Sequence, residues 1–182
     1  MPNMSGHMAI AKKVSEMLNI TDKDFYKGNL LPDLYRDKAK SHYKIQGTKY
    51  LVPDIETVIK VKDLNKPLDL GYLTHLLLDF HYLEDFLTPK YEENVFIGKN
   101  LYNDYDILNK DIVKHFNLDR EYIKSAMKDF DNDIELSKLD LNIRCLEFEK
   151  DGETYYLDKD DYIKFLEDAS ITIAEELRKY LK

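Results

Sequence analysis

His75 and Asp79 carry the strongest chemical signal in the sequence. They are four residues apart in a segment with a helical pattern, so both side chains project from one face about one turn apart. That face is otherwise rich in leucine, where an ionised carboxylate is costly unless a cation or several donors compensate it. Imidazole and carboxylate are standard zinc ligands, so a shared divalent metal would satisfy both groups. The competing interpretation of an isolated His-x-x-x-Asp pattern is a buried hydrogen-bonded pair.

Three more potential ligands lie earlier in the chain. His7 stands near the start of the first predicted helix, Asp33 follows a proline in a predicted turn, and His42 comes nine residues later. Each has an ordinary interpretation alone, as a surface histidine, a turn aspartate or a loop histidine. Together with His75 and Asp79 they give five candidate ligands from four segments, and this combination predicts a metal site.

Four short segments around these residues resemble a known family. They read GHMAIA at 6–11, GNLLPD at 28–33, SHY at 41–43 and GYLTHLLLD at 71–79. In order and rough spacing, over residues 6–80, they are similar to the zinc-dependent phospholipase C family, whose fold is shared with the single-strand-specific zinc nucleases.

The resemblance implies a role for each candidate ligand. Asp33, His42, His75 and Asp79 would hold one metal, and Asp79 would bridge to a second metal that His7 also contacts. Asp33 would be both a ligand and the base toward the incoming water, which makes it the catalytic candidate. The expected cofactor is therefore one or two zinc ions, although another divalent metal is compatible with these ligands.

The third metal of the family's fullest form uses downstream histidines that this chain does not match. His81 lies roughly 200° around the helix from Asp79 and leaves the ligand face. His115 has the helical spacing to Asp119, but Asp119 stands where the helix from residue 120 needs an N-cap. We therefore expect this metal to be absent or held by carboxylates.

Asp104 and Asp106 are the carboxylates that we consider for such a downstream site. Tyr82 lies two helical turns after His75, and we interpret it as a core residue rather than as a donor to the site.

Two functions remain open at this point. The resemblance implies a metal-dependent, phospholipase C-like hydrolase acting on a small phosphoester or a phospholipid headgroup. The alternative is a metal-holding binding or structural relative without turnover. The missing downstream histidines and the absence of a visible signal peptide favour it. The chain also keeps six residues before His7, whereas secreted members of the family bind a metal through a processed amino terminus, so the second metal has fewer ligands here. A helical phosphohydrolase of the HD type needs an adjacent His-Asp pair, which the sequence lacks.

The rest of the pattern predicts a mainly α fold, a single-domain helical bundle over residues 1–182. Only six glycines and five prolines interrupt it. We expect helices over 5–18, from 21 to just before Pro32, from 53, over 68–87, 101–117 and 120–130, and over 160–181. The segment 68–87 is apolar all round, which predicts a central buried helix. One β-hairpin is expected near residues 143–157, turning at 150–152.

Composition limits the partners. The net charge is −8, and no basic stripe exists that would neutralise an extended nucleic acid. No uncharged apolar stretch is long enough to cross a membrane and no signal peptide is visible, so we expect a cytoplasmic protein. Cys145 is the single cysteine, which excludes an intramolecular disulfide. The oligomeric state is left open.

Overall fold

The computed structural model describes residues 2–92, 98–127, 130, 138–139, 143–144 and 146–181, and this part of the chain is mainly helical, as predicted. Its elements are α1 (Met4–Leu18), α2 (Asp24–Leu34), α3 (Lys38–Ser41), α4 (Ile55–Val61), α5 (Pro67–His81), the π-helix η1 (Tyr82–Leu87), α6 (Lys99–His115), α7 (Arg120–Ala126) and α9 (Lys159–Arg178). None of the described helices has both the length and the apolar character that spanning a membrane requires.

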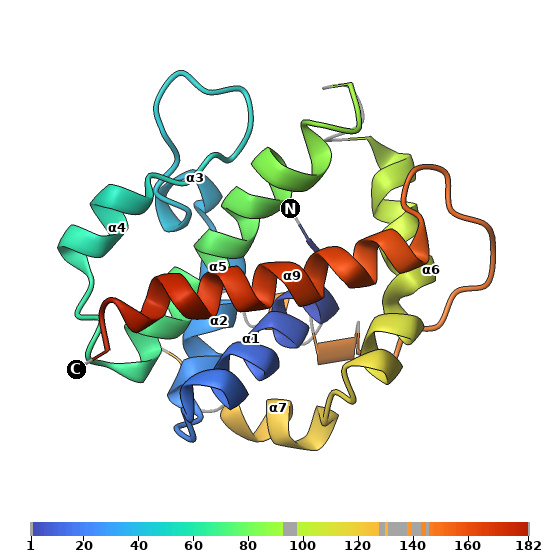
Figure 1. Cartoon of the computed structure of the whole chain (residues 1–182). Helices are drawn as coiled ribbons and strands as arrows, with labels where there is room; N and C mark the ends of the chain where they lie inside the picture. Colours follow the sequence, from blue (N-terminus) through green and yellow to red (C-terminus); the bar gives the residue numbers. More distant parts are fainter. Residues whose placement is uncertain are drawn as a thin grey trace.

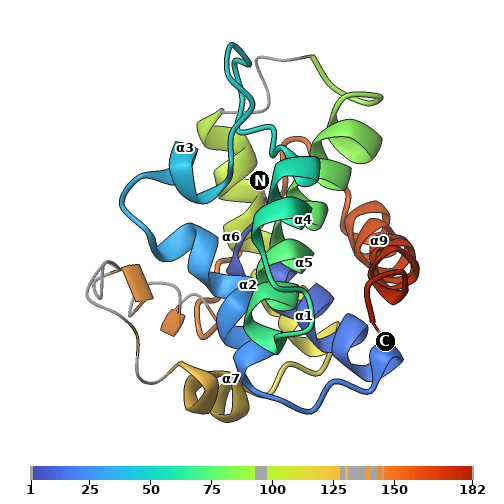
Figure 2. The same ribbon diagram turned by 90° about the vertical axis from the view of Figure 1, so that its left-hand side faces the viewer.

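Helix α5 is the centre of the fold. It begins at Pro67, whose fixed φ and missing N–H suit the first helical position. Figures 1 and 2 show α5 inside the molecule, with α2 and α9 on opposite sides of it in Figure 2. Helices α1, α2, α4 and α9 all contact it. Its residues from Leu70 to Asp79 are buried, which confirms the predicted central helix.

Two glycines allow α2 and α5 to cross with backbone against backbone. A Cβ added to Gly28 would lie 1.9 Å from the carbonyl oxygen of Leu68, and one added to Gly71 would lie 2.0 Å from that of Phe25. No larger residue fits either position unless the helices move apart. The crossing therefore fixes how closely the peptide groups of α2 approach the side chains of α5.

Helices α1 and α2 place two candidate ligands. Asn3 caps α1, with its side chain accepting a hydrogen bond from the Gly6 N–H, so His7 lies at the start of α1. We expected a helix that ends before Pro32, but α2 continues through this proline to Leu34. Asp33 is therefore held by the last turn of α2 instead of by a loop.

The predicted β-hairpin near residues 143–157 is wrong. No strand lies in the described residues of this segment, and Ile143 and Arg144 are helical. The physical reason is that a side chain distant in the sequence accepts the backbone hydrogen bonds that a partner strand would otherwise accept. The N–H groups of residues 155–157 donate to the carboxylate of Asp104, at 2.7–3.0 Å, and not to a partner strand. The chain does bend at Gly152, whose φ is 149°.

The glycine crossing gives a first prediction. Gly71→Ala should lower the free energy of unfolding by about 3 kcal/mol, because a methyl group there collides with a carbonyl that cannot move alone. Gly47→Ala is the matched control, since nothing lies near Gly47 and its cost is limited to its positive φ, about 1–2 kcal/mol. Chemical denaturation measures both. Equal losses in the two variants would show that α2 and α5 separate easily.

Candidate metal centre

The five predicted ligands come together in one cluster, which we call the His–Asp cluster: His7, Asp33, His42, His75 and Asp79. Each triad His7–His75–Asp79 and Asp33–His42–His75 has one ligand atom per residue within 4.8 Å of the others. They come from α1, the end of α2, the residue after α3, and α5. The three histidines are fully buried, Asp79 is 2% exposed, and the Asp33 side chain is 16% exposed. Asp33 is thus the member of the cluster that reaches solvent.

The ligand atoms face one another at short range. His75 Nε2 lies 3.3 Å from Asp79 Oδ2 and 3.3 Å from His42 Nε2. His42 Nε2 lies 3.5 Å from Asp79 Oδ2 and 3.7 Å from Asp33 Oδ1. His7 Nε2 is 3.5 Å from Asp79 Oδ1, and its ring stacks on that of His75 with 3.8 Å between centroids.

Backbone carbonyls fix the orientation of two rings. His75 Nδ1 lies 2.6 Å from the Asn29 carbonyl oxygen, and His42 Nδ1 lies 2.9 Å from that of Lys38. A carbonyl can only accept, so each Nδ1 carries its proton and each neutral ring leaves a lone pair on Nε2. Such second contacts to a non-ligating nitrogen are typical of metal-binding histidines.

The two Nε2 lone pairs therefore point at each other across 3.3 Å, with carboxylates beside them. With both rings neutral this arrangement is repulsive, unless a proton or a metal cation lies between the groups. Two ligands of one tetrahedral zinc ion, each about 2.0–2.2 Å from it, are separated by roughly 3.3–3.6 Å. The measured separations among His42, His75 and Asp79 agree with this range, so the donor set fits a zinc ion in both chemistry and spacing.

Unpartnered polar atoms mark the same place. Within the described part of the chain, neither ring nitrogen of His7 and neither carboxylate oxygen of Asp79 has a hydrogen-bond partner. Buried polar groups are rarely left so, and each costs about 1–3 kcal/mol. A bound cation would satisfy these atoms.

Burial dominates the electrostatics of the metal-free cluster. It lowers the pKa of His7 to about 3, with the neighbouring His75 adding to the effect. It also lowers the pKa of His42. Burial alone would raise the pKa values of Asp33 and Asp79, but the nearby histidines reverse it and hold both pKa values below normal, helped at Asp33 by Lys38. Both carboxylates are therefore ionised at neutral pH.

His75 behaves in the opposite way. Burial works to lower its pKa, but Asp79 and the contact to Asn29 raise it overall. His75 is thus the histidine of the cluster that most readily holds a proton in metal-free protein. A divalent metal would displace this proton, as metal binding to histidine sites generally releases protons.

Asp33 connects the cluster to the surface. Its Oδ1 pairs with Lys38 Nζ at 2.7 Å. Close by, a hollow of about 500 Å³ is lined by Ser41, whose hydroxyl is 3.1 Å from His42 Nδ1, and by Tyr72, one turn before His75. Its other lining residues are Tyr35, Arg36, Asp37, Lys40, Tyr43 and Lys62. Cations outnumber anions on this wall, in a chain of net charge −8.

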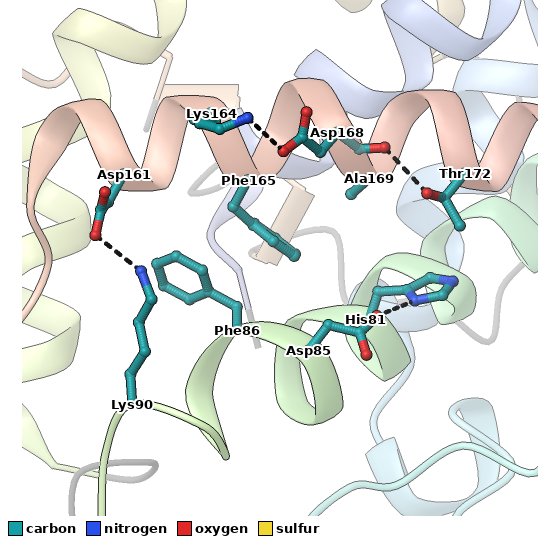
Figure 3. A pocket seen from close by; sticks show the side chains of 10 residues that line it. All are labelled: His81, Asp85, Phe86, Lys90, Asp161, Lys164, Phe165, Asp168, Ala169 and Thr172. Atoms are coloured by element: carbon teal, nitrogen blue, oxygen red, sulfur yellow. Dashed lines mark hydrogen bonds and ion pairs between the residues drawn. The ribbon is translucent and has the colours of Figure 1, made fainter.

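His81 lies outside the cluster, as its helical angle predicted. Its Nδ1 pairs with Asp85 at 2.6 Å, and its Nε2 lies 3.3 Å from Glu176. It lines a separate hollow of about 340 Å³ between η1 and α9, shown in Figure 3, where Phe86 and Phe165 face each other. This hollow contains none of the five cluster residues.

The remaining downstream candidates have structural roles. His115 pairs with Glu167 at 2.9 Å on the surface. Asp119 caps α7 by accepting the Tyr122 N–H, which confirms the capping interpretation. Asp104 is fully engaged by three backbone N–H groups, so it is not available as a metal ligand.

Two other residues complete this picture. Asp106 lies 3.9 Å from Lys150, away from the cluster residues. Tyr82 packs in the core, where its ring stacks on Phe86 and its hydroxyl accepts a hydrogen bond from Tyr105.

Sequence reasoning missed the groups that support the cluster. The carbonyls of Asn29 and Lys38 have no side-chain signature, since any residue provides a carbonyl. The hydroxyl of Ser41 stands next to His42 in the sequence, so that adjacency is a signal that could have been used.

The chain matches a family model described as zinc dependent phospholipase C over residues 6–180, which extends the resemblance to nearly its whole length. Comparison with curated proteins gives no match. Comparison with solved structures gives none either.

The low pKa of His7 predicts a pH dependence for metal-free protein. The unfolded chain binds a proton at this position below about pH 6.5, and the folded protein does so only near pH 3. The free energy of unfolding should therefore fall as the pH is lowered from about 6.5 toward 3. His7→Gln should flatten this slope in denaturant titrations with a chelator present. Exposed His115→Gln is the control and should keep the wild-type slope, while an unchanged slope in His7→Gln would contradict the prediction.

Proposed function

The chain belongs to the zinc-dependent phospholipase C family, and from this membership we propose that it is a zinc-dependent hydrolase of a phosphoester, with a phospholipid headgroup or a small phosphoester as its substrate. The observation that carries the metal assignment is the approach of His42 Nε2 and His75 Nε2 to 3.3 Å, with both Nδ1 atoms committed to carbonyls. A divalent cation would bind both Nε2 lone pairs and would replace the proton that otherwise has to lie between them.

We assign the ligands as follows. Asp33, His42, His75 and Asp79 would hold one ion, and Asp79 with His7 would hold a second. Asp79 offers one oxygen to each side, since Oδ2 faces His42 and His75 while Oδ1 faces His7. When bound, zinc activates water and stabilises charge on phosphoryl oxygens.

The residues around the ions have distinct tasks. Asp33 is the partly exposed member, so it meets the incoming water and is our candidate for the group that accepts its proton. Lys38 holds the Asp33 carboxylate at the mouth of the cluster through the 2.7 Å pair. The buried histidines and Asp79 exclude bulk water from the inner side, which strengthens each electrostatic contact there.

The hollow lined by Ser41 and Tyr72 is our candidate for the substrate headgroup. Its lining residues Ser41 and Tyr43 flank His42 in the chain, and its aromatic and cationic wall suits a polar or anionic group attached to the scissile phosphate. A nearby cationic wall would also attract an anionic substrate toward a protein of net negative charge.

One observation favours a second candidate, a metal-holding relative without turnover. Four of the five cluster side chains are at most 2% exposed. Structural zinc sites are closed in this way, whereas catalytic sites keep a position open for water or substrate. Measuring turnover decides between the two functions.

Metal content is the first test of the proposal. Protein purified without chelators should contain at least one equivalent of a divalent metal by elemental analysis, and added zinc should raise the unfolding midpoint of stripped protein. Less than about a tenth of an equivalent, with no response of the midpoint to zinc, manganese or nickel, would remove the basis of the proposal.

Activity is the second test. Zinc-loaded wild type should hydrolyse a generic phosphodiester such as a nitrophenyl ester, and Asp79→Asn should lower kcat/KM at least a hundredfold because both ions lose a charged ligand. Asp85→Asn is the matched control on the following turns of the same helical stretch, with its carboxylate outside the cluster, and should keep nearly full activity. Activity that survives Asp79→Asn would mean that the site is elsewhere. No hydrolysis by metal-loaded wild type across a broad panel would favour the non-catalytic relative.

A further inference from the structure

Tyr162 has a buried hydroxyl with no partner. The side chain, near the start of α9, is fully buried, and its hydroxyl makes no hydrogen bond within the described part of the chain. Leaving a hydroxyl in this state costs stability unless something else bonds to it.

Other buried tyrosines of the described chain are satisfied, so the lone hydroxyl is specific to this position. Tyr72 donates to the Ser41 carbonyl, Tyr26 bonds to Ser15, and Tyr105 donates to Tyr82. The contrast shows that the fold ordinarily provides partners for buried phenols.

The unpartnered hydroxyl lies beside the His–Asp cluster. On one side is the start of α1, where a Cβ added to Gly6, the residue before His7, would be 3.0 Å from the hydroxyl oxygen. On the other side, the Tyr162 ring packs against Tyr82, one turn after Asp79, with 5.9 Å between centroids. Tyr162 therefore reaches between the two segments that carry His7 and Asp79, whose own polar atoms are also unpartnered.

We propose that the Tyr162 hydroxyl donates a hydrogen bond to the oxygen ligand, water or a phosphoryl oxygen, that completes the ion held by His7 and Asp79. This inference rests on the proposed function. Helix α9 then becomes part of the site, through a residue that contacts water or substrate and lies 83 residues after Asp79 in the sequence. Glycine at position 6 is then required to leave room for the oxygen and its donor.

The charge state of the phenol agrees with a donor role. Burial, reinforced by the Asp79 carboxylate, raises the pKa of Tyr162. The hydroxyl thus keeps its proton at neutral pH and is able to donate it to an oxygen that carries negative charge, where hydrogen bonds are strongest.

Tyr162→Phe tests the proposal, with Tyr105→Phe as the matched control. In stripped protein, Tyr162→Phe should unfold at the wild-type midpoint or higher, because it removes an unsatisfied group. Tyr105→Phe should unfold at a lower midpoint, because it removes a hydrogen bond that is made. Calorimetric titration of the full chain with zinc alone, and of zinc-loaded protein with inorganic phosphate, then locates the partner.

The two titrations separate the sources of the oxygen. If the partner is water, Tyr162→Phe should weaken zinc binding about tenfold, as loss of an outer contact to a metal site does. If the partner is a phosphoryl oxygen, zinc binding should stay and phosphate binding should weaken about tenfold. Tyr105→Phe should change neither affinity.

Three results would overturn the inference. If wild-type and Tyr162→Phe proteins bind zinc and phosphate with equal affinity, the inference about Tyr162 is wrong but the proposed function stands. The same holds for a Tyr162→Phe midpoint in stripped protein that falls as far as that of Tyr105→Phe, because the hydroxyl would then have a partner in the protein. Wild-type protein that binds no zinc overturns the proposed function, and this inference with it.

Discussion

Helices α2 and α5 touch through glycine, and the orientation of the site follows from that contact. Gly28 and Gly71 let the two backbones meet, and the meeting brings the Asn29 carbonyl to 2.6 Å from His75 Nδ1. This bond fixes which nitrogen of His75 faces Asp79. Moving the helices apart by the width of a methyl group would break it. A packing constraint between two helices thus determines the proton placement on one imidazole, and through it the donor set of the whole cluster.

The cluster also shows how far this fold tolerates unfavourable electrostatics in its interior. Ionised Asp33 and Asp79 lie among three buried imidazoles, two of which bring their Nε2 atoms to 3.3 Å from each other. Packing of the surrounding helices offsets this unfavourable electrostatic energy in the metal-free protein. The cluster therefore lowers the stability of the metal-free protein, and the hydrophobic shell around α5 supplies the stability that the cluster lacks.

Sequence patterns predicted the local features and failed where the determining partner was distant. Apolar residues on every face of segment 68–87 predicted a central helix, because a helix that is buried on all sides has no polar face. His75 and Asp79 were singled out because an ionisable pair is unusual on such a face, and His7, Asp33 and His42 were added because they lie in motifs that resemble the family. The prediction of a β-hairpin was wrong because turn residues and alternating polarity indicate only local preference. In the structure the N–H groups of residues 155–157 donate to the carboxylate of Asp104, in α6. The unpartnered hydroxyl of Tyr162 has no signature in a chain with 14 tyrosines.

The proposed ligands come from four separate segments, so a bound ion would cross-link distant parts of the chain. An ion that joined His7 to Asp79, as proposed, would close a loop that contains α1 from His7 onward and all of α2, α3 and α4, a segment that is unrestrained in the unfolded chain. Such a cross-link restricts the unfolded ensemble much as a disulfide does, in a chain whose single cysteine rules out an intramolecular one. Loss of the ion would therefore release the amino-terminal helix first, and protease sensitivity at α1 would report the occupancy of a centre that is itself buried.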